Sequence, residues 1–383
     1  MRASIRVAAT AGIVILAVTG SLALGGSALA SSRVVGHLYV NDNTAGTNTI
    51  AAFDRHADGS LVPMSGSPFS IGGAGTGSST GSQGALQMTA DGRYLLAVDA
   101  GSNQISVLGI KPGGGLTPPI GGPVSSGGIE PVSIAVHGNL VYVANAGNGG
   151  SNYTGFLLSG GRLRPLSGST VSLPDGSSPG EVLFNGDGTN LAGMRVGTSL
   201  IDSFRVRRDG RLSAAAGSPF PAQGPGPFGS EFRPTNAREL YVSNAHGGPN
   251  AGTVSAFRVS NSGTLRSIGS SPYPDRQTAP CWVEISHDGR YLFTVNTAVP
   301  SISRYVIDGH GRLHLIGSTP FNDPTGLSPF DARLAPNGRT LWVVDSGAKA
   351  VSGFAVDGGD LMELSTSPTA LPTDAAPFGI VVT

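Results

Sequence analysis

Cysteine is almost absent from this chain of 383 residues, which has only Cys281, and an excess of charge of either sign is absent too. A single cysteine cannot form an internal disulfide, so the fold must be held by packing alone. The 24 basic and 24 acidic residues cancel and no basic stripe follows the sequence, so we expect no nucleic-acid partner. Beyond the N-terminal segment no apolar run is long enough to span a bilayer, so we expect no membrane association once that segment is removed.

The N-terminal segment has the pattern of an export signal. Arg2 and Arg6 precede an apolar stretch over residues 7–24, and residues 28–30 give the small-x-small pattern that signal peptidase reads. An uncleaved membrane anchor is the alternative, but the apolar stretch is near the shortest spanning length of about 17 residues. We therefore predict a secretory signal peptide over residues 1–30 and a secreted or periplasmic mature protein.

Glycine and proline are abundant, with 59 and 27 residues, and without a period this composition would indicate disorder. Here they recur with a period. The clearest copies of the repeat read DGRYLLAVD at residues 91–99, DGRYLFTVN at 288–296 and NGRTLWVVD at 337–345. Each copy is a turn pair followed by an apolar strand and a small polar residue, so the repeating unit is built from β-strands.

The polar residue that closes this strand, called the strand-end residue below, marks seven copies of the repeat. The seven are 46 to 57 residues apart: Asp42, Asp99, Asn145, Arg195, Asn244, Asn296 and Asp345. A repeat of about 50 residues with four short strands is typical of a β-propeller blade. We therefore predict an all-β fold over residues 31–383, a seven-bladed β-propeller of four-stranded antiparallel blades.

The inner strand of each blade opens with proline or a substitute for it. The openers are Gln83, Pro131, Pro179, Pro227, Pro280, Pro329 and Pro377. The last of them starts a unit that the chain end truncates, so its strand is expected to pair with the strand that begins at residues 37–40 and to close the ring. Residues 72–84, rich in glycine, serine and threonine, are an insertion after the first blade, and we expect them to form a flexible surface loop.

Polar side chains gather at alternate positions of the inner strands. Positions one, three and five after each opener are mostly apolar and are expected to pack against a neighbouring blade. Positions two and four point to the central channel, and they include Trp282 and five charged residues: Glu181, Glu231, Glu284, Asp331 and Arg333. A concave site with a few charged groups is where a propeller binds small ligands. The alternative is a set of ion-paired groups that lines a solvated channel.

Two more candidates lie outside the inner strands. In propellers the loops into the inner strands and the strand-end residues share one side of the ring, the loop side, whereas the Asp-Gly turns lie on the other, the turn side. Arg195 stands where the other blades have Asp or Asn, a change that suits an anion or is drift, and His246 is the one histidine placed on the loop side. The other strand-end residues are predicted to bond to nearby backbone. The sequence contains no readable metal or cofactor motif.

The repeat Ser-Pro-Phe, Pro-Phe-Gly, Asn-Gly-Arg-x-Leu-x-Val-Val-Asp resembles the seven-bladed lactonase family, which contains 6-phosphogluconolactonase-type enzymes and fungal carboxymuconate cyclases. The resemblance covers residues 33–383 and implies the propeller fold. Enzymes of that family typically have a Pro-His pair and a Gly-Pro-Arg-His motif at two inner-strand openings, and here residues 131–132 and 226–229 read PV and GPFG instead. The family's Glu corresponds to Asn244 or Ala245, and its Arg-Gly turn to residues 297–300.

Two functions follow as hypotheses. A secreted lactonase-like hydrolase would use Glu231 or Glu284 as general base and Arg333 or Arg195 to hold the developing oxyanion, with a lactone or sugar acid as ligand. A non-catalytic exported propeller would instead bind a small ligand or a protein partner on its rim. We expect a monomer in either case.

Overall fold

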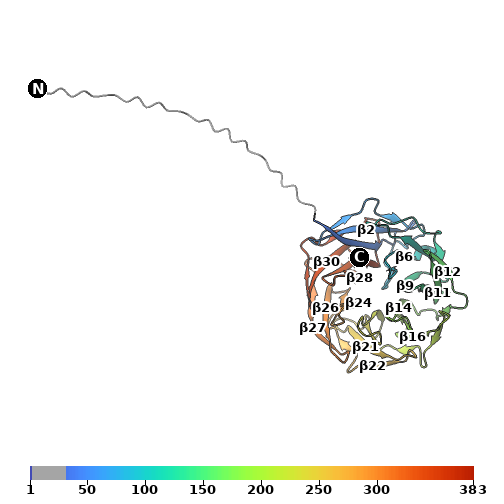
Figure 1. The fold of residues 1–383 in the computed structure, drawn as a ribbon. Helices are drawn as coiled ribbons and strands as arrows, with labels where there is room; N and C mark the ends of the chain where they lie inside the picture. The colour runs from blue at the N-terminus through green and yellow to red at the C-terminus, as the bar shows by residue number, and fades with distance from the viewer. Residues whose placement is uncertain (2–31) are drawn as a thin grey trace. The chain divides into compact units, whose positions relative to one another are not determined.

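The repeats form seven antiparallel sheets, here called blades 1–7, around a ring (Figure 1). The structure is a computed structural model that describes Met1 and residues 32–383. Apart from Met1, the predicted signal peptide lies outside the described residues. The seven sheets confirm the predicted all-β, seven-bladed fold.

Blades 1–3 contain the first thirteen strands and β33. Blade 1 consists of β33 (Ile380–Val382), β1 (Val34–Asn41), β2 (Thr49–His56), β3 (Leu61–Pro63) and β4 (Phe69–Ser70). Blade 2 consists of β5 (Leu86–Met88), β6 (Tyr94–Asp99), β7 (Gln104–Gly109) and β8 (Val124–Ser125), with the short 3-10 helix η1 (Ala100–Ser102) after β6. Blade 3 consists of β9 (Pro131–His137), β10 (Leu140–Asn145), β11 (Asn152–Ser159), β12 (Arg162–Pro165) and β13 (Val171–Ser172).

Blades 4–7 repeat the same order from the channel outward. Blade 4 consists of β14 (Pro179–Phe184), β15 (Asn190–Arg195), β16 (Leu200–Val206), β17 (Leu212–Ala214) and β18 (Phe220–Pro221). Blade 5 consists of β19 (Pro227–Phe232), β20 (Glu239–Asn244), β21 (Thr253–Val259), β22 (Leu265–Ser267) and β23 (Tyr273–Pro274). Blade 6 has β24 (Pro280–Ile285), β25 (Tyr291–Asn296), β26 (Ser301–Ile307) and β27 (Leu313–Pro320). Blade 7 has β28 (Pro329–Leu334), β29 (Thr340–Asp345), β30 (Ala350–Asp357), β31 (Asp360–Glu363) and β32 (Thr369–Ala370).

The ring closes where the two ends of the propeller meet. β33 pairs antiparallel with β1, with Ile380 opposite Val40 and Val382 opposite Leu38. The backbone N–H of Phe378 also donates to Asn41 O at 3.1 Å. The C-terminal strand is therefore the inner strand of blade 1, as predicted, and blade 1 is built from both ends of the propeller chain.

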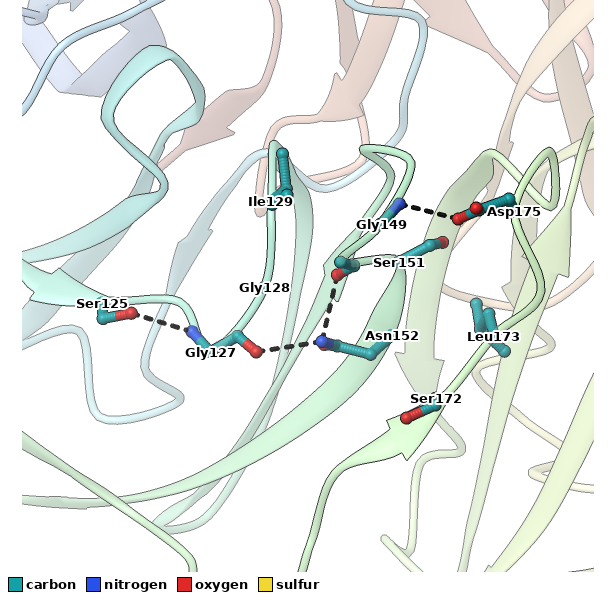
Figure 2. A pocket seen from close by; sticks show the side chains of 11 residues that line it. Ser125, Gly127, Gly128, Ile129, Gly149, Ser151, Asn152, Ser172, Leu173 and Asp175 are labelled. Atoms are coloured by element: carbon teal, nitrogen blue, oxygen red, sulfur yellow. Dashed lines mark hydrogen bonds between the residues drawn. The ribbon is translucent and has the colours of Figure 1, made fainter.

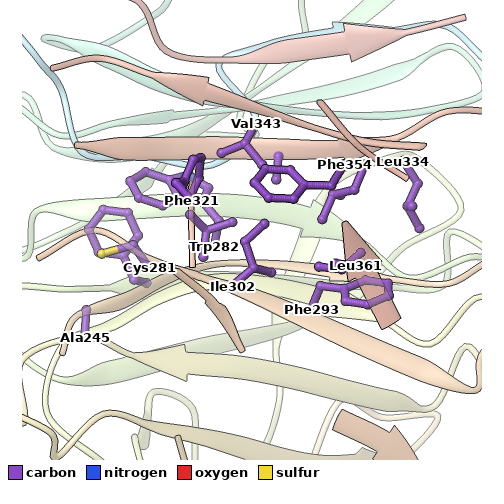
Figure 3. Close-up of a cluster of buried hydrophobic side chains, with 14 residues drawn as sticks. Ala245, Cys281, Trp282, Phe293, Ile302, Phe321, Leu334, Val343, Phe354 and Leu361 are labelled. Carbon is purple, nitrogen blue, oxygen red and sulfur yellow. The ribbon is translucent and has the colours of Figure 1, made fainter. Parts of the chain in front are cut away.

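The core lies between the blades. One cluster joins Trp282 and Phe293 of blade 6 to Val343 and Phe354 of blade 7, and Cys281 lies within it (Figure 3). These side chains come from adjacent sheets, so each blade buries apolar side chains against the next. Burial raises the pKa of the Cys281 thiol to about 12, which makes it an inert core side chain.

Each strand-end residue makes a polar contact within its blade. In six blades its partner is a polar residue at the start of the third strand, at 2.5 to 2.9 Å: Asp42 with Thr49, Asp99 with Ser106, Asn145 with Asn152, Arg195 with Asp202, Asn244 with Ser255 and Asn296 with Ser303. In blade 7 Asp345 Oδ1 accepts the N–H groups of Ser328 and Ala348. The strand-end residues therefore join strands and loops inside each blade.

The contact between Asp99 and Ser106 indicates that the Asp99 carboxyl group is protonated. Ser106 Oγ lies 2.6 Å from Asp99 Oδ2 and 2.9 Å from Ile71 O, which gives two acceptors for one hydroxyl hydrogen. A protonated Asp99 resolves the conflict, because it donates to Ser106 and leaves the Ser106 hydrogen to Ile71. Burial raises the pKa of Asp99 to about 7, although the bonds from Ser106 and Asn48 lower it. The folded state therefore favours the neutral acid.

We expect Asp99→Asn to leave stability nearly unchanged at about pH 4 and to raise it at about pH 8. A carboxyl group whose pKa rises on folding contributes stability that is complete below its unfolded pKa of about 4 and is lost as the pH rises through the folded value. Asparagine, the strand-end residue of three other blades, keeps the contact with Ser106 without titrating. Thermal unfolding at both pH values checks this, and an identical pH dependence in the two chains would contradict it.

Candidate functional site

The channel holds a cluster of four carboxylates around one guanidinium group. Arg333 Nη1 lies 3.3 Å from Glu284 Oε2. Burial alone would lower the pKa of Arg333, but the negative charges of four acids raise it above its ordinary value: Glu284, Asp331, Glu231 and Glu181. The structure thus brings together the five charged residues that the inner-strand pattern places at the channel, from blades 4, 5, 6 and 7.

Three of these acids also tie their blade to the next one. Glu231 Oε2 accepts the N–H of Ile285, and Glu284 Oε1 accepts the N–H of Leu334 at 2.8 Å. Glu181 Oε2 accepts the hydroxyl of Ser230 at 2.7 Å. Each bond crosses from one inner strand to the inner strand of the following blade, so these acids position the blades as well as the charge.

Burial shifts the acids of this cluster toward their protonated forms. Burial raises the pKa of Glu181 and Glu231 well above the ordinary value for glutamate, and it raises that of Glu284, although the charge of Arg333 opposes the shift. The pKa of Asp331 rises to about 6 for the same reason. One cation cannot balance four anions in a buried site, so protonation supplies the rest. The cluster can therefore both donate and accept protons.

The loop side of the channel is closed by the end of the insertion. Ser82 and Gln83 are buried, and the Gln83 side chain donates to Ser230 O and Val283 O at 3.2 and 3.0 Å while it accepts the Val283 N–H at 3.1 Å. Ser82 O accepts the indole N–H of Trp282 at 2.8 Å. Residues 80–84, called the plug below, thus cross the channel from blade 2 to blades 5 and 6.

The plug corrects the expectation that all of residues 72–84 form a surface loop. The inner strands accommodate it because glycine leaves room: a Cβ at Gly229 would lie 2.2 Å from Gln83 Oε1. The Gly84 N–H also donates to Asp331 Oδ2 at 3.3 Å, so the plug reaches the acidic cluster. Composition indicated a loop, but only the tertiary contacts show that its end is buried.

The reachable part of the cluster faces the turn side. Asp331 and Glu181, at position two of their strands, are buried, whereas Glu231 and Arg333, at position four and nearer the Asp-Gly turns, are partly exposed. The Arg333 side chain retains 27% of its exposure. The partly exposed members of the cluster, Arg333 and Glu231, therefore lie on the half of the inner strands nearer the turn side.

Trp282 and His246 do not join this cluster. Trp282 is buried between Phe228 and Phe330, with ring centroids at 5.3 and 4.8 Å in T-shaped contacts, and its N–H is used by the plug. His246 is exposed in a loop after β20, where its ring covers Gly226. The structure gives Trp282 a packing role, and it places His246 at the surface.

Arg195 is already paired. Its Nε and Nη2 atoms donate to the two oxygens of Asp202 at 2.6 and 2.5 Å, and Tyr153 donates its hydroxyl to the same carboxylate at 3.0 Å. Asp202 is 2% exposed. Arg195 thus replaces the Asp or Asn of the other blades, and its partner Asp202, seven residues later, replaces the serine that blade 6 has at the equivalent position.

We expect Arg195→Asn to destabilise the fold by about 3–5 kcal/mol, because it leaves the buried Asp202 without its cation. Adding Asp202→Ser recreates the Asn–Ser pair that blade 6 forms between Asn296 and Ser303 and should restore most of the loss. Chemical denaturation of the single and double variants measures both effects. A double variant no more stable than Arg195→Asn would contradict the paired-exchange interpretation.

A pocket of about 680 Å³ lies among the loop-side loops of blade 3, and no motif in the sequence indicated it (Figure 2). Asp175 Oδ1 accepts the Gly149 N–H at 2.7 Å, and Asn152 Nδ2 donates to Gly127 O and Gly150 O at 2.9 and 3.1 Å. Its lining is mostly glycine and serine, so it offers backbone groups rather than catalytic side chains. Among the described residues no group of His, Cys, Asp and Glu has the arrangement of a metal site.

Comparison with known proteins places the fold. Residues 199–377 match the family described as lactonase, 7-bladed beta-propeller. A candidate 6-phosphogluconolactonase of Bacteroides uniformis has 20% identity and a TM-score of 0.71, over 91% of this chain and 99% of that one. The periplasmic gluconolactonase PpgL of Pseudomonas aeruginosa has 20% identity and a TM-score of 0.68, over 91% and 98%.

No curated protein matches the chain. Within the described residues no helix is both long and apolar enough to cross a membrane. At these identities the solved structures support the fold, and the family match adds sequence evidence from the third strand of blade 4 to the end of blade 7. The chain is a seven-bladed β-propeller that resembles the lactonase family, as its repeat predicted.

Proposed function

We propose that this protein hydrolyses a small lactone at the turn side of its channel. The observation that carries the proposal is the set of buried acids with raised pKa values around Arg333, in which Glu231 and Arg333 itself are partly exposed. Lactone opening needs a base for water and a cation for the oxyanion, and the cluster offers both. The resemblance to lactonases supports the same reaction class.

Glu231 and Arg333 have distinct roles in this proposal. The ionised form of the Glu231 carboxyl group, whose share grows as the pH rises toward its raised pKa, takes a proton from water as the water oxygen attacks the carbonyl carbon, and Arg333 binds the oxygen on which negative charge develops. The ring C–O bond then breaks, and Glu231 returns the proton to the leaving oxygen, which gives the hydroxy acid. Glu284 orients Arg333 through the 3.3 Å contact. The raised pKa of Glu231 makes it a stronger base than an ordinary carboxylate.

A panel of γ- and δ-lactones tests the proposal. We expect Glu231→Gln to lower kcat by a factor of about 100 or more, the usual contribution of a general base. Asp187→Asn, on an exposed turn of blade 4, is the matched control and should leave kcat unchanged. Equal turnover in the wild-type chain and in Glu231→Gln would reject Glu231 as the base.

A non-catalytic propeller is the second candidate, and the plug favours it. The plug closes the loop side, where residues 131–132 and 226–229 also differ from the family motifs. In that case the blade 3 pocket binds a small polar ligand through backbone groups. No turnover of any lactone, together with a ligand-induced rise in Tm that Asp175→Lys removes, would favour binding over hydrolysis.

We also propose that residues 1–30 direct export and are then removed, on the evidence of the sequence pattern. N-terminal sequencing of protein recovered outside the cytoplasm should begin at Ser31. A retained Met1 in that fraction would overturn the proposal.

A further inference from the structure

Arginine gathers on the turn sides of three consecutive blades. Outside the channel cluster, the strand ends and turns on the turn side of blades 3, 4 and 5 contain ten arginines and three acidic residues, whereas those of the other four blades together contain eight basic and eight acidic residues. The net charge of zero for the whole chain therefore hides an uneven distribution. The surface of blades 3–5 near their turns is called the arginine arc below.

Most of the arc is not neutralised by acidic neighbours. Asp209 pairs with Arg207 and Arg211 at 3.1 and 3.0 Å, and Glu239 pairs with Arg233 and Arg258 at 2.9 and 3.1 Å. Six further arginines make no salt bridge to a described residue: Arg162, Arg164, Arg205, Arg208, Arg238 and Arg266. All six are exposed.

Contacts between the blades make the arc continuous. Arg211 of blade 4 donates from Nε to Ser167 O at 2.9 Å, just beyond β12 of blade 3, which carries Arg162 and Arg164. On the other flank, Ser203 of β16 donates its hydroxyl to Gly263 O at 2.6 Å, in the turn between Arg258 and Arg266. The three groups of arginines therefore follow the outer edge of the ring from one blade to the next.

The fold tolerates repulsion within the arc. Arg258 lies directly opposite Arg266 in the pairing of β21 with β22, and like charges at such positions destabilise a sheet. Arg207 and Arg208 are neighbours in the turn after β16 of blade 4, which places a second pair of like charges close together. A local cost of this kind is expected where a bound anion offsets it.

We propose that the arginine arc binds a linear anionic polysaccharide. A guanidinium group offers paired donors that match carboxylate, sulfate or phosphate groups, and a path along the edge of three blades suits an extended chain. Single-stranded nucleic acid is usually held by base stacking on aromatic rings, and a bilayer by inserted apolar side chains. Among the exposed large hydrophobic residues described, none is aromatic and Leu157 alone lies near the arc.

Heparin, a sulfated polysaccharide, is the probe. We expect the wild-type chain to bind it with an affinity that falls steeply with salt, because binding releases counterions. Replacing Arg162, Arg164, Arg205 and Arg208 by Gln should weaken binding at least tenfold and reduce the salt slope by about 3. The matched control replaces four exposed turn-side arginines of other blades by Gln: Arg93, Arg290, Arg312 and Arg339.

The outcomes separate the arc from general charge. Loss in the arc variant with retention in the control supports the proposal. Equal loss in both variants, or no heparin binding by the wild-type chain at low salt, overturns it. Tighter binding to duplex DNA or to phosphatidylglycerol vesicles than to heparin would overturn the choice of polysaccharide. Circular dichroism and Tm verify that both variants are folded.

Discussion

A chain that stops after Ala376 is expected to be insoluble or to lack a cooperative unfolding transition. The deletion removes β33, which is the inner strand of blade 1 and pairs with β1. Phe378 and Ile380 are fully buried, so their loss exposes the apolar faces of the adjoining blades. It also leaves β1 as an unpaired edge strand, which favours aggregation. Expression, gel filtration and thermal unfolding measure the outcome.

A pair of point substitutions controls for the loss of chain length. Ile380→Asp places a charge at a fully buried position of β33, whereas Met362→Asp alters a side chain on β31 that is 70% exposed. The first should cost about 4 kcal/mol or more and the second about 0.5 kcal/mol or less. A soluble, cooperatively folding truncated chain would show that the ring does not depend on this closure.

Arg333→Met should destabilise the fold strongly at alkaline pH and weakly at acidic pH. The substitution removes the cation that lowers the pKa of Glu181, Glu231, Glu284 and Asp331, so these pKa values rise further. At about pH 8 the variant must bury uncompensated carboxylates, at a cost of about 3–5 kcal/mol. At about pH 5 these groups are mostly protonated in both chains, so the cost should fall to roughly 1 kcal/mol.

The direction of this pH dependence follows from linkage. Because folding raises the pKa of each acid, the contribution to stability is complete below the unfolded pKa of about 4 and is lost as the pH rises through the folded value. Because the pKa values of these acids are higher in the variant, the pH range over which it loses stability extends to higher pH. Denaturation at several pH values checks this, with Arg339→Met on the exposed turn of blade 7 as control. A cost that does not change with pH would show that Arg333 acts by packing alone.

The fold could be predicted because each level of the sequence repeats. Turn pairs, strand alternation and strand-end residues recur at a period near 50 residues, and the last opener, Pro377, indicates how the ring closes. Convergence of the inner-strand charges follows from the same geometry. A propeller fixes which positions face its axis, so residues far apart in sequence, such as Glu181 and Arg333, could be assigned to one site.

The plug could not be predicted, because its contacts have no period. Gln83 occupies the place of a proline opener, and its side chain reaches Val283, two hundred residues away. Nothing in a stretch of glycine and serine specifies such a partner. The pairing of Arg195, by contrast, left a readable signal: Asp202 departs from the repeat seven residues after Arg195 does, and reading both departures together would have indicated an ion pair.

The arginine arc was hidden for a different reason. Its arginines are separated in the sequence, so they form no basic stripe. Acidic residues elsewhere balance them, so the net charge of the chain is zero. Only the stacking of blades 3, 4 and 5 aligns them. A neutral chain can therefore present a charged face when the repeat places its arginines at equivalent ends of adjacent sheets.

The proposed chemistry depends on carboxyl groups whose pKa is raised by burial, and an NMR titration of ¹³C-labelled glutamate side chains measures this directly. Resonances are assigned by Gln substitution at Glu181, Glu231 and Glu284. The account predicts that at least two of these groups remain protonated at about pH 6, whereas ordinary glutamates ionise near 4.3. Ionisation of all three near the ordinary value would contradict it.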